Sequence, residues 1–185
     1  YDDVDGTDEG VTDVGADPSL YYSINMSGMT ISASYSRTGL GTDNSVAIVA
    51  NELVDGAVFG IGTGTNVISN TSEDDLTTVF ATYATGPITV GVQLSEIDKT
   101  AANSDVDREH ASLSFAVNEN LSISYGVSNV KYESSSKSDE ESSGFSASYT
   151  MGGMTLGAVA NKSDSLLGTA GTDRTFTEVS LAFAF

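Results

Sequence analysis

Carboxylates dominate the ionisable chemistry of this chain, which has 26 Asp and Glu against 7 Lys and Arg. The first 18 residues contain no base and seven of the acids: Asp2, Asp3, Asp5, Asp8, Glu9, Asp13 and Asp17. Asp3, Asp5 and Asp8 are candidate calcium ligands, because closely spaced Asp residues around a Gly are typical of calcium-binding loops. The Glu that closes such a loop is missing, so a solvated acidic loop stays open as the alternative. We expect no cofactor other than this possible calcium ion.

Few other side chains offer catalytic or metal-binding chemistry. The chain has no Cys and a single His, His110, which excludes Cys/His zinc sites, iron–sulfur clusters and thiol nucleophiles. Any site built from Ser, His and an acid would depend on His110 alone, so we expect the chain not to be an enzyme. The formal net charge of −19 repels phosphate backbones and excludes nucleic acid as a partner.

The segments that carry these residues alternate in polarity at every second position, which is typical of strands with two unlike faces. In LSISYGVS (121–128), for example, apolar residues occupy the odd positions, and Ser or Gly occupies the even ones. No run of about 18 apolar residues is present, so we expect no transmembrane helix. We expect eleven strands, over 19–26, 29–36, 45–53, 57–62, 76–83, 87–97, 109–117, 121–133, 142–150, 154–163 and 174–185.

The two faces of these expected strands differ in chemistry. Six strands have one apolar face without charge, as lipid contact requires, because Lys or Arg at mid-bilayer costs roughly 2–4 kcal/mol. Their other face carries small polar residues, which suit a crowded wet interior better than open solvent. The register of 45–53, 57–62 and 76–83 stays ambiguous. A water-soluble β-sandwich would also keep charge off its buried face, so the apolar faces alone leave both folds open.

The connections favour the barrel. Short turns alternate with longer polar loops near 37–44, 63–75, 98–107, 135–141 and 164–173. Aromatic residues stand near strand ends, as in the interfacial girdles of membrane barrels: Tyr35, Tyr83, Tyr149 and Phe185. The joint pattern predicts an all-β protein, a transmembrane antiparallel β-barrel.

The strand count predicts an incomplete barrel. Bacterial single-chain barrels have even strand numbers, whereas eleven strands are expected here. The chain also begins with Tyr1, and no signal-peptide pattern opens it. We therefore expect it to be the C-terminal portion of a larger barrel.

Three segments resemble the Gram-negative general diffusion porins, the sixteen-stranded trimeric kind: ADPSLYYSINMSGMTISASYS, SASYTMGGMTLGAVA and the terminal EVSLAFAF. The resemblance covers essentially the whole chain and implies that about 11 of 16 strands are present. It implies that residues 1–18 are the tail of an acidic constriction loop that folds into the pore. Residues 19–185 would then be barrel strands with short periplasmic turns and long extracellular loops. It also implies a homotrimer.

The resemblance assigns further roles along the chain. The alternating apolar C-terminus is similar to the signal for outer-membrane insertion: Val179, Leu181, Phe183 and Phe185. In this family a basic cluster on the wall faces the acidic constriction. Because successive side chains of a strand alternate between its two faces, we expect Arg108 on the inward face with His110, and Arg174 on that face with Glu178. Both arginines stand at strand beginnings beside long loops, so a solvated rim position stays open for them.

We expect a water-filled channel in the outer membrane for passive diffusion of small hydrophilic solutes and ions, with carboxylates favouring cations. The expected partners are outer-membrane lipid, small solutes, cations and further copies of the chain. One alternative is a secreted or surface-displayed acidic β-protein, such as an adhesin or a calcium-stabilised sandwich. Another is a non-porin outer-membrane barrel, either the translocator of a surface protein or a small enzyme.

Overall fold

The computed structural model describes residues 19–26, 29–38, 43–52, 54–69 and 72–184. The acidic segment 1–18, which contains the predicted constriction acids and the calcium candidates Asp3, Asp5 and Asp8, lies outside the described residues. The terminal Phe185 does so as well. The roles expected for these residues therefore stay predictions.

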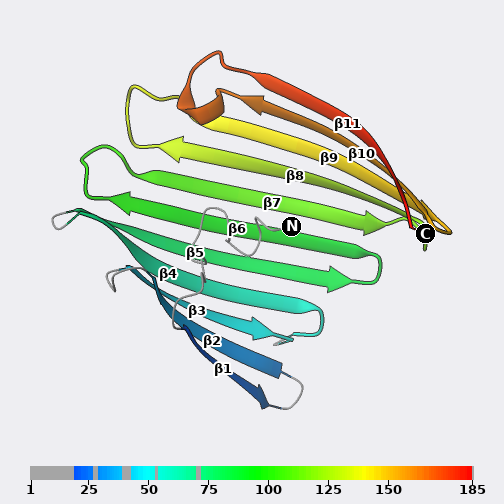
Figure 1. The fold of residues 1–185 in the computed structure, drawn as a ribbon, viewed down its shortest axis with the longest axis horizontal. Coiled ribbons are helices and arrows are strands. Elements are labelled where there is room, and N and C mark those ends of the chain that lie inside the picture. The colour runs from blue at the N-terminus through cyan, green and yellow to red at the C-terminus, as the bar shows by residue number, and fades with distance from the viewer. Residues whose placement is uncertain (1–18, 27–28, 39–42, 53, 70–71, 185) are drawn as a thin grey trace.

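Eleven strands form one sheet, in which each strand pairs antiparallel with the next in sequence (Figure 1). They are β1 (Ser19–Met26), β2 (Met29–Thr38), β3 (Asp43–Asn51), β4 (Ala57–Ser69), β5 (Ser72–Thr85), β6 (Ile88–Lys99), β7 (Val106–Ala116), β8 (Leu121–Tyr132), β9 (Glu140–Met151), β10 (Met154–Asp164) and β11 (Arg174–Phe183). The predicted all-β antiparallel sheet of eleven strands is confirmed. The described strands belong to this one sheet, whereas a β-sandwich needs two facing sheets.

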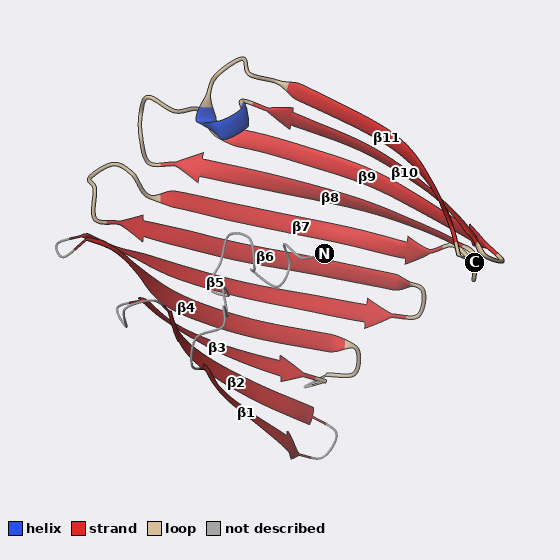
Figure 2. Ribbon diagram, in the orientation of Figure 1, coloured by secondary structure: helices blue, strands red, loops and turns tan. Residues whose placement is uncertain are grey.

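The two ends of the sheet differ in their connections. At the short-turn end, β5 and β6 are joined by residues 86–87, and β9 and β10 by residues 152–153. Gly86 and Gly152 have positive φ angles of 54° and 59°, a conformation that two-residue hairpin turns need and that glycine adopts without strain. At the opposite, long-loop end lies the 3₁₀ helix η2 (Leu166–Gly168), between β10 and β11 (Figure 2).

The predicted loop over 63–75 is wrong. β4 continues to Ser69 and β5 begins at Ser72, so this stretch forms the end of a long hairpin. Its residues pair across the two strands, with a register shift between Val67 and Ser69. Thr65 also donates its hydroxyl hydrogen to Asp75 over 3.0 Å. Polarity suggested a loop, but Thr and Val favour extended backbone, and a paired hairpin can carry polar side chains.

The pairing register gives the sheet an apolar face and a polar face. The apolar face is defined by exposed large side chains: Ile48, Ile61, Val79, Val92, Leu113, Tyr125, Phe145, Leu156 and Leu181. Ile61 pairs directly with Ile48 on one side and Val79 on the other, which settles the register that the sequence left ambiguous for β3, β4 and β5. The polar face consists of the alternate residues, among which Ser, Thr and Gly are the most frequent.

The sheet encloses almost no apolar core among its described residues. Its buried hydrophobic side chains there are Ala57, Val106 and Val130. An apolar surface of this extent is unfavourable in water, so it marks contact with another apolar phase or a partner. No helix among the described residues is long and apolar enough to cross a membrane. β4 to β11 contain 10 to 14 residues each, and a tilted strand needs about 9–11 residues to span a bilayer.

Candidate functional site

Small hydroxyl side chains build the polar face and hydrogen-bond between neighbouring strands. The Ser124 and Ser146 hydroxyls lie 2.7 Å apart between β8 and β9. Ser142 donates to Ser163 over 2.8 Å between β9 and β10. Because side chains alternate between the faces of a strand, the period-two sequence pattern sends these residues to one surface. That surface offers uncharged donors and acceptors to water or to a solute.

The least exposed polar side chains of the described residues lie on β5 and β6. Thr78, Gln93 and Ser95 retain 5%, 1% and 6% of their accessible surface. Thr78 donates to the Ser95 hydroxyl oxygen over 3.0 Å, and Gln93 Nε2 donates to the same oxygen over 3.2 Å. Gln93 Oε1 is buried without a hydrogen-bond partner. Gln93 is the only Gln of the chain, which was a signal that sequence reasoning did not use.

An aromatic ring interrupts the small side chains of the polar face. Phe80 on β5 pairs with Gly60 on β4, and a Cβ atom on Gly60 would stand only 2.2 Å from Phe80 Cε1. The ring therefore lies directly over the glycine. Glycine in a strand often marks such a close approach, so Gly60 makes room for the Phe80 ring.

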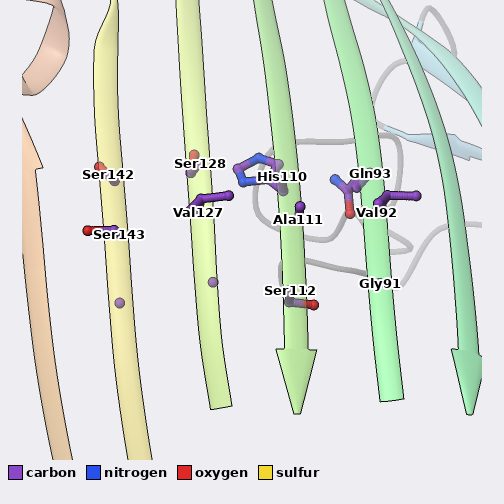
Figure 3. Close-up of a pocket in the computed structure, with 12 residues that line it drawn as sticks. Gly91, Val92, Gln93, His110, Ala111, Ser112, Val127, Ser128, Ser142 and Ser143 are labelled. Carbon is purple, nitrogen blue, oxygen red and sulfur yellow. The ribbon is translucent and has the colours of Figure 1, made fainter. Parts of the chain in front are cut away.

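A groove of about 250 Å³ crosses the polar face over β6, β7, β8 and β9 (Figure 3). On each of the four strands three consecutive residues line it, such as Gly91, Val92 and Gln93 on β6, and His110, Ala111 and Ser112 on β7. The groove therefore contains the single His of the chain together with the buried Gln93. Its described lining includes hydroxyl, imidazole and carboxamide groups but no carboxylate or ammonium group.

A polar cluster stands on the polar face at the long-loop end of the sheet. Arg108 on β7 is half-buried and interacts electrostatically with Tyr132 and Glu140. The side chains of Tyr132 and Glu140 also interact with each other. The Lys137 ammonium lies 4.2 Å from the centre of the Tyr132 ring, a cation–π distance. Sequence reasoning found Arg108 but missed Glu140, because it expected residues 135–141 to be loop.

The same cluster makes hydrogen bonds to the two loops that precede β9 and follow β10. The Leu167 backbone N–H, in η2, donates to Glu140 Oε2 over 2.8 Å. The Ser138 backbone N–H donates to the Gly168 carbonyl oxygen over 3.0 Å. Glu140 thus holds the loop after β10 while it interacts with Arg108 on the wall. These contacts join the two loops to each other and to the first residue of β9.

Arg174 and Glu178 lie on the polar face of β11, where parity placed them. Arg174 is the first residue of β11 and pairs with Ser163, and Glu178 pairs with Val159. Both are exposed. Four strand steps separate β11 from β7, so Arg174 lies about 19 Å from Arg108 across the sheet, since neighbouring strands are about 4.8 Å apart. The structure therefore does not bring the two predicted arginines into one cluster.

Among the described residues, the charged side chains of the apolar face lie near the long-loop end. There Lys131 and Glu109 form an ion pair at 2.7 Å, and Lys162 and Asp164 form another at 2.6 Å. All four side chains are well exposed. On β8, Lys131 stands four residues beyond Val127, at the same parity, so the charged region begins where the apolar band ends. This boundary is expected where a strand leaves the hydrocarbon of a membrane.

The C-terminal strand contributes to the apolar band. Val179, Leu181 and Phe183 point to the apolar face and are all more than half exposed. Tyr83 and Tyr149 stand on the same face near the short-turn ends of β5 and β9, where an interfacial girdle is expected. The geometry of a membrane barrel wall is therefore present: an apolar band, aromatic edges and a polar opposite face.

Comparison with known proteins gives a family and a fold. The sequence model of the Gram-negative porin family matches residues 2–150. No curated protein matches the chain by sequence.

Several solved structures share its architecture. A porin structure aligns with a TM-score of 0.66 at 16% identity, over 91% of this chain and 62% of that one. A loop L8 deletion mutant of OmpT, an outer membrane protein of Vibrio cholerae, aligns with a TM-score of 0.60 at 14% identity, over 90% and 62%. The NanC porin aligns with a TM-score of 0.55 at 14% identity, over 90% and 92%.

The chain spans 62% of the length of the first two of these structures. At such identities the likeness concerns the fold, and it confirms the predicted transmembrane antiparallel β-barrel. The sequence match supplies the family, since it covers most of the chain. The chain belongs to the Gram-negative porin family and is an integral protein of the outer membrane.

Proposed function

We propose that the chain forms the wall of a water-filled channel through which small hydrophilic solutes and ions diffuse passively. The observation that carries this proposal is the contrast between the two faces of one sheet. The apolar face contacts lipid, and the polar face, with its paired serine hydroxyls, lines the lumen. Small uncharged side chains leave room for water and offer it hydrogen bonds. The proposal assigns no catalytic role to any residue.

The channel would prefer cations. The chain has a net charge of −19 and only seven bases. Two of these bases, Lys131 and Lys162, are paired with acids on the apolar face, and Lys137 lies over the Tyr132 ring. A lumen and mouth of net negative charge raise the local concentration of cations. The acids of residues 1–18 would add to this field as a constriction inside the pore.

Assembly and insertion complete the proposal. The family resemblance supports a homotrimer embedded in outer-membrane lipid. Val179, Leu181, Phe183 and Phe185 would act as the C-terminal insertion signal, and the first three are exposed on the apolar face as lipid contact requires. Migration of unheated and heated protein on a denaturing gel tests the assembly, because a stable trimer shifts to the monomer position on heating.

Planar-bilayer recording of the full-length protein tests the channel. We expect stepwise conductance and, in a potassium chloride gradient, a reversal potential of the sign that indicates cation preference. A reversal potential of the opposite sign would refute the charge argument, and absence of conductance would refute the channel itself.

Two neighbouring residues on β9 provide a matched test of the faces. The chain has no native Cys, so Ser146→Cys on the polar face and Phe145→Cys on the apolar face give single thiols. A charged, membrane-impermeant methanethiosulfonate should modify the thiol at 146 and reduce conductance. The thiol at 145, which faces lipid, should stay unmodified. The reverse pattern would contradict the assignment of the lumen.

A further inference from the structure

The groove on the polar face has a floor row that crosses four strands, with a glycine on three of them and Ser112 on the fourth. Gly91 on β6 pairs with Ser112 on β7, Ser112 pairs with Gly126 on β8, and Gly126 pairs with Gly144 on β9. Glycine has no side chain, so the wall is thinner at these three positions than on either side of the row. The sequence places the three glycines 35 and 18 positions apart, and only the register brings them into line.

The row next to the glycines forms a polar rim. Gln93, His110, Ser128 and Ser142 occupy successive strands, and each pairs with the next. This rim offers two kinds of group to a solute: hydroxyls that donate or accept, and amide or imidazole groups that do the same in fixed directions. The groove lining described above has no charged carboxylate or ammonium group. It therefore suits a neutral hydrogen-bonding solute better than an ion.

Gln93 supplies the observation that points to a ligand. Its side chain is 1% exposed, its Nε2 donates to Ser95, and its Oε1 has no partner. Figure 3 shows the carboxamide oxygen on the side of Gly91, at the glycine row, and the nitrogen on the opposite side. A buried acceptor without a donor is unfavourable. Because this oxygen is itself buried, a hydroxyl group in the groove would satisfy it once the carboxamide rotates further toward the glycine row.

We propose that this groove is a subsite for a neutral polyhydroxylated solute with the dimensions of one monosaccharide ring. The proposal rests on the channel function and gives that channel a solute class. A volume of about 250 Å³ is below the roughly 300–1,000 Å³ of sites for drug-sized ligands, and it suits a single small ring. Sugar hydroxyls donate to Gln93 Oε1 and exchange hydrogen bonds with Ser112 and Ser128. Binding must be weak for transport, because a solute that enters has to leave again.

Two variants change the groove in different ways. Gln93→Met removes the carboxamide at similar size. Gly126→Ala fills the floor: its new Cβ would lie 3.6 Å from the Ala111 carbonyl oxygen and 4.0 Å from Ser112 Cβ, which are ordinary contacts. Gly144 is unsuitable, because a Cβ there would lie 2.6 Å from Asn161 Oδ1. Ser122→Ala, on the polar face of β8 but outside the groove lining, is the matched control.

The probe is D-glucose, added to planar bilayers that contain the full-length protein in potassium chloride. We expect a saturable fall in ion current for the unmodified protein and for Ser122→Ala. Gln93→Met should raise the half-saturating glucose concentration by roughly two- to tenfold, the effect of losing one neutral hydrogen bond. Gly126→Ala should raise it too, because the added methyl group takes up space at the floor of the groove.

The controls distinguish failure of the proposed subsite from failure of the channel function. Each variant must conduct ions before glucose is added, which establishes that it folds and inserts. Absence of any conductance would refute the channel function. Normal conductance with a merely linear, non-saturating response to glucose would refute the subsite alone. An unchanged half-saturating concentration in both groove variants would refute it as well.

Discussion

Leu113→Arg should destabilise the folded protein far more than the same substitution at the adjacent Ser114. Leu113 is 48% exposed on the apolar face of β7, between its partners Val90 and Tyr125, which are also exposed. Ser114 points to the polar face. If the apolar face contacts lipid, arginine at 113 must enter the hydrocarbon, whereas arginine at 114 stays in the water-filled lumen.

The expected magnitudes differ by more than experimental error. An arginine at the bilayer midplane of a barrel costs roughly 2–4 kcal/mol, falling to about 0–1 kcal/mol near the interface. For Leu113→Arg this lowers the ratio of folded to unfolded protein roughly 30- to 700-fold, since about 1.4 kcal/mol is a factor of ten. Ser114→Arg should change the free energy of unfolding by about 0.5 kcal/mol or less.

The assay is guanidinium denaturation of the full-length protein refolded into phospholipid vesicles, followed by far-ultraviolet circular dichroism. The chain has no Trp, so tryptophan fluorescence of the native sequence is not an option. Val117→Arg, at the short-turn end of the same face, provides an internal depth control and should cost much less than Leu113→Arg. Equal destabilisation by Leu113→Arg and Ser114→Arg would refute the assignment of the two faces.

Three further predictions follow from particular contacts. Glu140→Gln should speed hydrogen exchange of the Leu167 amide, which donates a hydrogen bond to Glu140, by about fivefold or more, because a charge-assisted hydrogen bond becomes a neutral one. Glu141→Gln, on the other face of β9, should leave that exchange rate unchanged. Gly60→Ala should cost roughly 1–3 kcal/mol by overpacking, and adding Phe80→Leu should recover most of it in the same denaturation assay; a Gly60→Ala protein of normal stability would contradict the close approach. Lys131→Ala should leave the denaturation midpoint nearly unchanged, because an exposed ion pair contributes little, and a large shift would show that this pair is desolvated.

The number and type of elements could be read from the sequence because alternation is a local property. Each strand shows its two faces within about eight residues, whatever it pairs with. The errors came where local signals conflict. The polar residues of 63–75 suggested a loop, but strand pairing with their neighbours keeps them extended. Glu140 was assigned to a loop for the same reason, although it begins β9 and anchors η2.

The candidate sites were less accessible to sequence reasoning. Parity placed Arg108, Arg174 and Glu178 on the polar face, as the register has them. Parity could not show that Arg108 interacts with Glu140 while Arg174 lies four strands away. Nor could it single out Gln93, whose importance comes from an unpartnered oxygen in a groove.

The sequence by itself determined an acidic chain of alternating strands with one apolar and one small polar face, which already indicated a membrane barrel. The tertiary structure alone decided which residues of different strands share a row. That division has a physical cause: the period of two is set within a strand, whereas register depends on turn geometry and on pairing between strands. The glycine row of Gly91, Gly126 and Gly144, and with it the proposed solute site, exists only through that register.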